Sequence, residues 1–213
     1  MRCGAVPPTI VEEDTSSDVA VPERSKVSLR CRAEGYPPPT VTWRREEGKD
    51  INIATYASRS GSSGVTRVEG EYLNLTQVKR EDMGAYLCIA ANGIPPSVSK
   101  RILLQVNFKP KIRVPNQLVG IALGRPRCTW SAGWRPPRGP LTSWVRGADG
   151  LILLRNTSKF SVTEHLHSSY RTNMTLRIAH VDESDFGPYK CVAKNTLGEK
   201  EGYVRLYGGC LYI

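Results

Sequence analysis

Six cysteines and three Asn-x-Ser/Thr sequons are the residues of this 213-residue chain that could carry chemistry. No two cysteines form a Cys-x-x-Cys pair, which argues against a zinc ribbon or a thioredoxin-like redox site. Their wide, isolated spacing suits disulfide bridges between sheets in an oxidising compartment. The cysteines are Cys3, Cys31, Cys88, Cys128, Cys191 and Cys210.

The sequons begin at Asn74, Asn156 and Asn173. Each is a glycan acceptor only in a secreted protein. Around Asn74 and Asn173, strand alternation turns the neighbouring Leu and Met inward and each Asn outward, which leaves both accessible for attachment. Asn156 falls in an expected loop and is the best placed of the three. The sequence therefore predicts glycosylation at these asparagines.

No other residues form a convincing chemical site. His165 and His167 would share one face of a strand, but no third metal ligand is evident, so we expect a surface pair. A Gly-x-Ser-x-Gly elbow, a phosphate-binding glycine loop and a catalytic Cys/His constellation are all missing from the sequence. We therefore predict no catalytic, metal-binding or cofactor-binding residues, and a protein that is not an enzyme.

An internal repeat indicates which elements position these residues. Residues 82–90 match residues 185–193, at an offset of 103 (185 − 82). The apolar pattern of residues 73–78 recurs in residues 176–181 at the same offset. The chain therefore contains two copies of a unit of about 100 residues.

Both copies have the pattern of short β-strands. Val27, Leu29 and Cys31 alternate with polar residues, as in a half-buried strand. Gly and Pro clusters separate such runs, and turn signals every ~8–12 residues indicate a β-sandwich.

The first copy carries a specific signature. Cys31 precedes Trp43 by 12 residues, and Cys88 ends an Asp-x-Gly-x-Tyr-x-Cys run. This arrangement resembles an immunoglobulin domain. The resemblance implies that Cys31 and Cys88 bridge the two sheets, that Trp43 packs on the bridge, and that Tyr86 forms the tyrosine corner. We predict an all-β fold of two tandem immunoglobulin-like (I-set/C2-type) β-sandwiches.

The second copy departs from this signature. Trp144 and Tyr189 hold the corresponding core positions, and Cys191 holds the last-strand position, but Ala132 stands where the partner cysteine is expected. Cys128 comes three or four residues early, about 10–13 Å along a strand. A disulfide needs Cα atoms within about 7 Å. Cys128 can therefore meet Cys191 only if the strand slips or bends.

Residues 125–138 also lack strand alternation, and they contain two consecutive prolines and four arginines without an acid. Proline argues against a central strand. Codons for residues 129–132, read two nucleotides along, can encode an apolar residue, Glu and Cys, which restores a cysteine at 131/132. We hypothesise that 125–138 is a frameshifted segment; the alternative is a genuine divergent strand. The predicted domains are 6–106 and 107–207, and the tails 1–5 and 208–213 leave Cys3 and Cys210 unpaired.

The formal net charge is +10, which raises nucleic acid as a partner. Residues 125–138 supply +4 of this charge, leaving 10 − 4 = +6, and basic residues do not cluster elsewhere. We therefore predict no nucleic-acid binding. No stretch approaches the ~20 apolar residues of a membrane helix, and the N-terminal residues lack a signal peptide's apolar region.

Several stretches resemble the neuronal immunoglobulin adhesion family, which includes lachesin, amalgam, the Dpr-interacting proteins and IgLON proteins such as neurotrimin. These stretches are residues 6–10, 34–39, 83–91, 169–176 and 191–199. The resemblance covers roughly residues 6–207 except 125–138. It is nearest to the second and third domains of a three-domain ectodomain.

This resemblance implies an extracellular, cell-surface adhesion or recognition protein of the nervous system. Its partners would be other immunoglobulin-superfamily cell-surface proteins, bound homophilically or heterophilically. Membrane association would need a lipid anchor outside this chain, and the family's usual recognition domain would also lie outside it. Two alternatives are an intracellular filament module and an ectodomain fragment of a signalling receptor. Cytosolic domains rarely need disulfides, which weighs against the filament protein.

Overall fold

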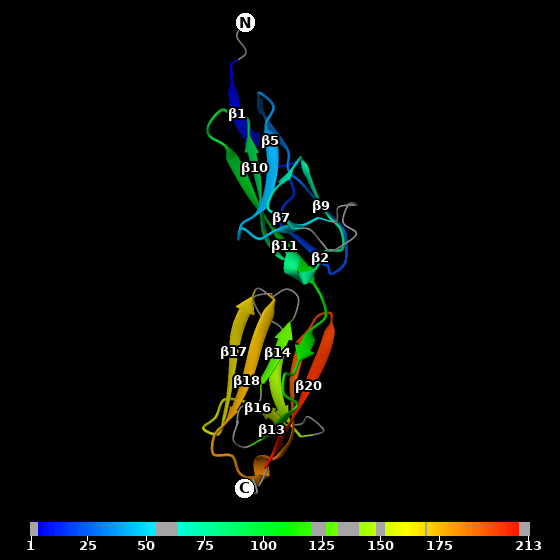
Figure 1. The fold of residues 1–213 in the computed structure, drawn as a ribbon, viewed down its shortest axis with the longest axis vertical. Helices are drawn as coiled ribbons and strands as arrows, with labels where there is room; N and C mark the ends of the chain where they lie inside the picture. The colour runs from blue at the N-terminus through cyan, green and yellow to red at the C-terminus, as the bar shows by residue number, and fades with distance from the viewer. Residues whose placement is uncertain are drawn as a thin grey trace. The chain divides into compact units, whose positions relative to one another are not determined.

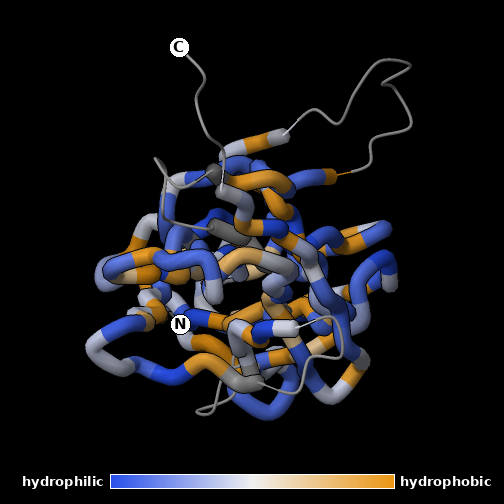
Figure 2. Tube along the Cα trace, turned by 90° about the horizontal axis from the view of Figure 1, so that it is seen from below, coloured by the Kyte–Doolittle hydropathy of each residue, from blue (hydrophilic) through white to orange (hydrophobic). Residues whose placement is uncertain are grey.

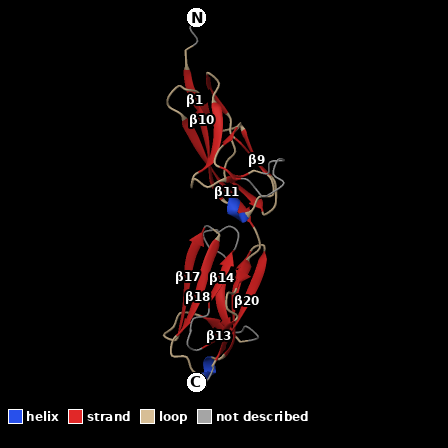
Figure 3. Ribbon diagram, in the orientation of Figure 1, coloured by secondary structure: helices blue, strands red, loops and turns tan. Residues whose placement is uncertain are grey.

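A computed structural model of the chain describes residues 4–53, 64–120, 127–131, 141–147, 152–168 and 170–208, and for 127–131, 141, 152 and 153 only the backbone. The chain divides into two compact units, Met1–Asn107 and Phe108–Ile213. Both consist of β-strands with one short 3-10 helix in the described part of each (Figures 1 and 3). No helix among the described residues is long and apolar enough to cross a membrane.

Unit 1 is a sandwich of antiparallel strands with one parallel edge. One layer is a five-stranded sheet in the order β2-β11-β10-β5-β8, in which β2 runs parallel to β11. The antiparallel pair β3–β9 faces it, and the pairs β1–β4 and β6–β7 complete the unit. Its elements are β1 (Val6–Ile10), β2 (Val19–Pro22), β3 (Val27–Arg30), β4 (Ala33–Tyr36), β5 (Thr40–Arg45), β6 (Ile51–Asn52), β7 (Gly64–Val65), β8 (Val68–Glu69), β9 (Tyr72–Leu75), η1 (Arg80–Asp82), β10 (Gly84–Ala91) and β11 (Val98–Asn107).

Unit 2 repeats this plan. A five-stranded sheet has the order β13-β20-β19-β15-β16, with β13 parallel to β20, and a four-stranded sheet has the order β12-β14-β18-β17. Its elements are β12 (Lys111–Arg113), β13 (Leu118–Gly120), β14 (Arg127–Ser131), β15 (Leu141–Arg146), β16 (Ile152–Leu154), β17 (Phe160–Ser168), β18 (Arg171–Ile178), η3 (Glu183–Asp185), β19 (Gly187–Asn195) and β20 (Gly198–Tyr207).

Alternation along the strands builds both cores. In β18, Thr172, Met174, Leu176 and Ile178 are buried, and the residues between them are exposed or half-buried. Apolar and polar segments interleave in the same way along much of the chain trace (Figure 2). Because successive strand residues point to opposite faces, this pattern turns one face of each sheet toward the core.

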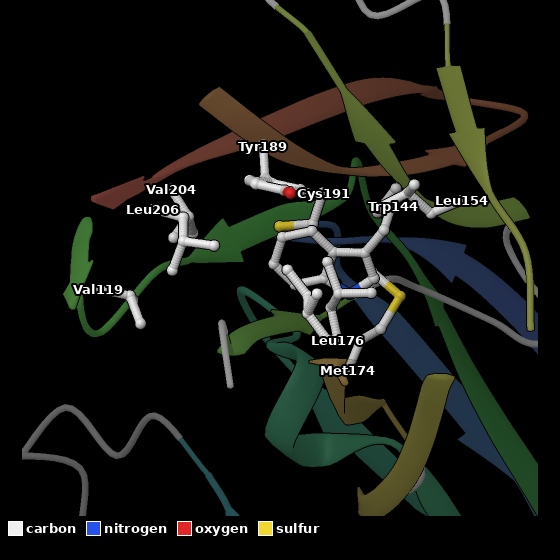
Figure 4. Close-up of a cluster of buried hydrophobic side chains, with 11 residues drawn as sticks. Val119, Trp144, Leu154, Met174, Leu176, Tyr189, Cys191, Val204 and Leu206 are labelled. Atoms are coloured by element: carbon white, nitrogen blue, oxygen red, sulfur yellow. The ribbon is translucent and has the colours of Figure 1, made fainter. Parts of the chain in front are cut away.

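The core strands of the two units pair in the same register. Trp43 pairs with Cys88 between β5 and β10, and Trp144 pairs with Cys191 between β15 and β19. Both tryptophans are fully buried. In unit 2, Trp144, Cys191 and Leu176 come from different strands and gather in one cluster of buried side chains (Figure 4). The predicted all-β fold of two immunoglobulin sandwiches is confirmed.

Strand β14 lies within the segment that the sequence marks as irregular. Its residue Cys128 pairs with Met174 of β18. In unit 1, the Cys31 amide donates to the Glu71 carbonyl at 2.8 Å, and Glu71 corresponds to Met174 at the repeat offset (174 − 71 = 103). The backbone of Cys128 therefore occupies the register position of Cys31. The displacement along the strand that the count back from Trp144 predicts is therefore not present in the backbone of β14. The frameshift hypothesis stays a prediction.

Candidate recognition surface

The bridge predicted in unit 1 is present. Cys31 and Cys88 form a disulfide with their Cα atoms 6.4 Å apart, and both residues are fully buried. Trp43 lies opposite Cys88, and its indole N–H donates to the Gly70 carbonyl at 2.9 Å. This disulfide and this tryptophan hold the two layers of unit 1 together, so the core keeps the exposed faces of both sheets in fixed positions.

Among the described residues of unit 2, no such bridge is present. Cys191 is a free, fully buried cysteine, so the structure does not contain the bridge between Cys128 and Cys191 that the sequence left in question. The side chain of Cys128 lies outside the description, as do Cys3 and Cys210. The buried indole N–H of Trp144 has no hydrogen-bond partner among the residues that the structure describes, in contrast to that of Trp43. Unit 2 is therefore held by packing rather than by a covalent link through Cys191.

Both tyrosine corners are formed. The Tyr86 hydroxyl donates to the Asp82 carbonyl at 2.9 Å, and the Tyr189 hydroxyl donates to the Asp185 carbonyl at 2.8 Å. Burial raises the pKa of Tyr86 to about 12 and also raises the pKa of Tyr189. Both phenols therefore stay protonated donors at physiological pH, and each fixes the turn that enters β10 or β19.

An arginine supports each corner, and the sequence analysis missed both. Arg45 is buried, donates to the Glu81 and Met83 carbonyls at 3.1 and 2.7 Å, and lies 5.5 Å from the centre of the Tyr86 ring. Arg146 lies 5.9 Å from the centre of the Tyr189 ring. The available signal was position: each arginine stands two residues after the core tryptophan of its unit.

The two corners differ in how the aspartate is paired. In unit 1, the Asn52 amide donates to Asp82 Oδ1 at 2.6 Å. In unit 2, the Lys159 ammonium lies 2.8 Å from Asp185 Oδ2 and 2.6 Å from Asp182 Oδ2. The hydrogen bonds from Lys159 and then Ser184 lower the pKa of Asp182 to about 2. Unit 2 thus depends on an ion pair where unit 1 uses an uncharged amide.

The three sequon asparagines lie on the surface. Asn74 in β9 and Asn173 in β18 are exposed between buried neighbours, as strand alternation predicted. Asn156 is exposed ahead of β17, and its Oδ1 accepts a hydrogen bond from the Val162 amide at 2.6 Å. That contact leaves Nδ2, the glycan acceptor atom, available. Occupancy of all three stays a prediction.

The two histidines are surface residues on β17. His165 and His167 are both exposed. Within the described ranges, no group of three or more His, Cys, Asp or Glu side chains is arranged to hold a metal ion.

An open groove of about 550 Å³ lies on the outer face of the five-stranded sheet of unit 1. Because Trp43 and Cys88 point into the core, the residues beside them on β5 and β10 point outward and form the floor. Leu87 and Ile89 supply apolar surface. The lining residues are Thr42, Arg44, Arg45, Glu46, Gly48, Thr66, Arg67, Leu87, Ile89 and Ala91.

Charge along this groove is mostly positive and partly neutralised. Arg67 Nη2 donates to Thr42 Oγ1 at 3.0 Å and lies 3.5 Å from Glu69 Oε1. Glu46 pairs with Arg101 at 3.0 Å. Arg44 is exposed and has no acidic partner among the described residues. Arginine beside apolar surface is the composition enriched at protein interfaces. The sequence did not reveal this groove because its lining comes from separate strands.

Comparison with known proteins assigns the chain to a family. A model of the immunoglobulin domain matches residues 7–92, and a model of the immunoglobulin I-set domain matches residues 141–207. Lachesin of Drosophila melanogaster is 33% identical over 205 residues, covering 94% of this chain and 52% of lachesin. Protein amalgam of Drosophila melanogaster is 28% identical over 200 residues, covering 94% of this chain and 56% of amalgam. The chain thus spans about half the length of the curated relatives it matches.

Solved structures extend the likeness. A chain from the crystal structure of Dpr2 Ig1-Ig2 in complex with DIP-Theta Ig1-Ig3 is 40% identical, with a TM-score of 0.82, covering 96% of this chain and 65% of that one. The titin Ig tandem A164-A165 is 20% identical with a TM-score of 0.68, which shows the fold alone. The chain therefore belongs to the immunoglobulin superfamily, and it is similar to lachesin and amalgam over most of its length.

Proposed function

We propose that this chain is part of a cell-surface recognition protein of the nervous system that binds other immunoglobulin-domain proteins. The observation that carries the proposal is the 40% identity, over 96% of the chain, to a component of a complex between two immunoglobulin-domain proteins. The relatives lachesin and amalgam support the same assignment. Association would be weak at each copy and effective through many copies on a membrane.

The proposed contact face is the groove on the outer face of unit 1's five-stranded sheet. It combines Leu87 and Ile89 with Arg44, which is exposed and has no acidic partner in the described part of the chain. Apolar surface supplies the area to be desolvated, and charge steers the partner and sets its specificity. An extracellular location agrees with the Cys31–Cys88 disulfide, because such bridges are rare in the cytosol. The titin likeness is one of fold and gives no independent reason to favour an intracellular filament protein.

A binding screen tests the proposal. The secreted chain would be presented in multimeric form to a panel of immunoglobulin-superfamily ectodomains, and each positive pair would be measured by surface plasmon resonance. Arg44→Glu should weaken binding about tenfold or more, which corresponds to about 1.4 kcal/mol. The matched control is Lys26→Glu, an equal charge reversal at an exposed residue beside β3, which should leave affinity unchanged. If no partner binds, the proposed function is wrong. If the two variants weaken binding equally, the groove is not the contact face.

A further inference from the structure

The exposed side of β9 places an aromatic ring and a sequon asparagine in one row, and the sequon threonine follows directly after the strand. Tyr72, Asn74 and Thr76 are exposed and alternate with the buried Leu73 and Leu75. Residues two apart on a strand lie about 7 Å apart on the same face. The Tyr72 ring therefore stands within reach of a sugar attached to Asn74 Nδ2.

The neighbouring strand β3 leaves room for that sugar and orients the ring. Ser28 lies directly opposite Asn74, and Arg30 lies opposite Tyr72. The small serine leaves open space beside the asparagine. The Arg30 guanidinium lies 5.6 Å from the centre of the Tyr72 ring, and its Nε donates to Glu71 Oε1 at 2.7 Å. Tyr72 nevertheless keeps 49% of its surface exposed, so the ring is positioned but not covered.

The other two sequons lack this arrangement. Asn173 lies on β18 between β14 and β17, beside His165, and the residue two before it is Arg171. Asn156 stands in a connection and is held by its own hydrogen bond to the Val162 amide. Of the three sequons, Asn74 alone has an exposed aromatic residue two positions ahead on its own face.

We propose that Asn74 carries an N-linked glycan whose first N-acetylglucosamine packs on the Tyr72 ring. The C–H groups on one face of a pyranose carry partial positive charge and suit the negative face of an aromatic ring. The proposal rests on the proposed function, because the sugar donor, a lipid-linked oligosaccharide diphosphate, acts on secreted chains. Asn74 Nδ2 loses a proton and bonds to sugar C1, while the bond from C1 to the diphosphate oxygen breaks and the lipid diphosphate leaves.

It follows that the two outer faces of unit 1 would have different roles. The glycan would cover the outer side of the β3–β9 pair. The groove beside Arg44 lies on the outer side of the opposite, five-stranded sheet. Sugar and protein partner would therefore occupy different faces, and the glycan would exclude partners from the β3–β9 side.

The experiment combines glycopeptide mass spectrometry with unfolding of the full secreted chain. Thr76→Ala removes the sequon but keeps Asn74, and it would be made with Tyr72, with Tyr72→Phe and with Tyr72→Ala. Ser158→Ala is the matched control, because it removes the Asn156 sequon and keeps the Asn156 hydrogen bond. The same variants made without glycans in an oxidising bacterial compartment report any effect of the substitutions on their own.

With Tyr72 or Phe at position 72, loss of the Asn74 glycan should lower the unfolding temperature of unit 1 by about 4 °C, a shift readily measured in a domain of this size. With Ala at position 72 this shift should vanish. The effect of Ser158→Ala on the unfolding temperature should be the same whichever residue stands at position 72. Equal shifts with and without the ring would overturn the packing, and an unoccupied Asn74 beside an occupied Asn156 would overturn the site. A chain that is secreted with no glycan at any sequon would likewise overturn this inference, whereas a chain that is not secreted at all would overturn the proposed function instead.

Discussion

Reducing the Cys31–Cys88 disulfide should destabilise unit 1 and leave unit 2 unchanged. The bridge has a sequence separation of 57 residues. The chain-entropy relation for a loop of that size gives about 4 kcal/mol of stabilisation at 25 °C. In a domain of about 100 residues each kcal/mol corresponds to about 4–8 °C. The unfolding temperature of unit 1 should therefore fall by roughly 16–32 °C, while that of unit 2, with its free Cys191, should not shift.

The assay follows both units in the same molecule. Calorimetry with and without a thiol reductant gives the two transitions, and hydrogen exchange of β10 and β19 peptides assigns them to unit 1 and unit 2. A Cys31→Ala, Cys88→Ala double variant should match the reduced protein and lose its response to reductant. An unchanged unit 1 transition would refute the entropic account of the bridge.

If reduction lowers the unfolding temperature of unit 2, the assignment of Cys191 as a free thiol would be wrong instead. The backbone makes that outcome interpretable, because Cys128 pairs with Met174 at the register position that Cys31 holds in unit 1. Reductant sensitivity of unit 2 would then mean that Cys128 and Cys191 are joined in solution. Peptide mapping under non-reducing conditions would identify the linked pair.

Two further perturbations probe the corners. Tyr86→Phe removes the donor to the buried Asp82 carbonyl and should cost unit 1 about 1–3 kcal/mol; calorimetry checks this, with the unit 2 transition as the internal control. The depressed pKa of Asp182, about 2, supports folding above the unfolded value near 3.9. That support is lost as pH falls toward about 2. Urea midpoints of unit 2 should drop over this range, and Lys159→Met should flatten the dependence; parallel curves for both proteins would contradict this.

The residues set by local pattern were predictable from the sequence. Cys31, Trp43, Tyr86 and Cys88 stand at the spacing of the immunoglobulin signature, whose resemblance implied their roles, and the structure places them in the bridge, the core and the corner. Arg45 was not predicted, because its role depends on carbonyls that the chain brings close only after η1 forms. The groove beside Arg44 was not predicted either, since its lining joins residues from β5, β10 and the β7–β8 turn.

Strand β14 shows where counting along a sequence stops being informative. Cys128 stands 16 residues before Trp144, whereas Cys31 stands 12 residues before Trp43. If the four extra residues lay within the strand, Cys128 would be displaced along it. Register, however, is set by the hydrogen-bonded neighbour and by which face is buried. Pairing with β18 puts Cys128 opposite Met174, so the four extra residues fall between that strand position and Trp144. The position of Cys128 in the sheet is therefore determined by the pairing of β14 with β18, and not by the number of residues between Cys128 and Trp144.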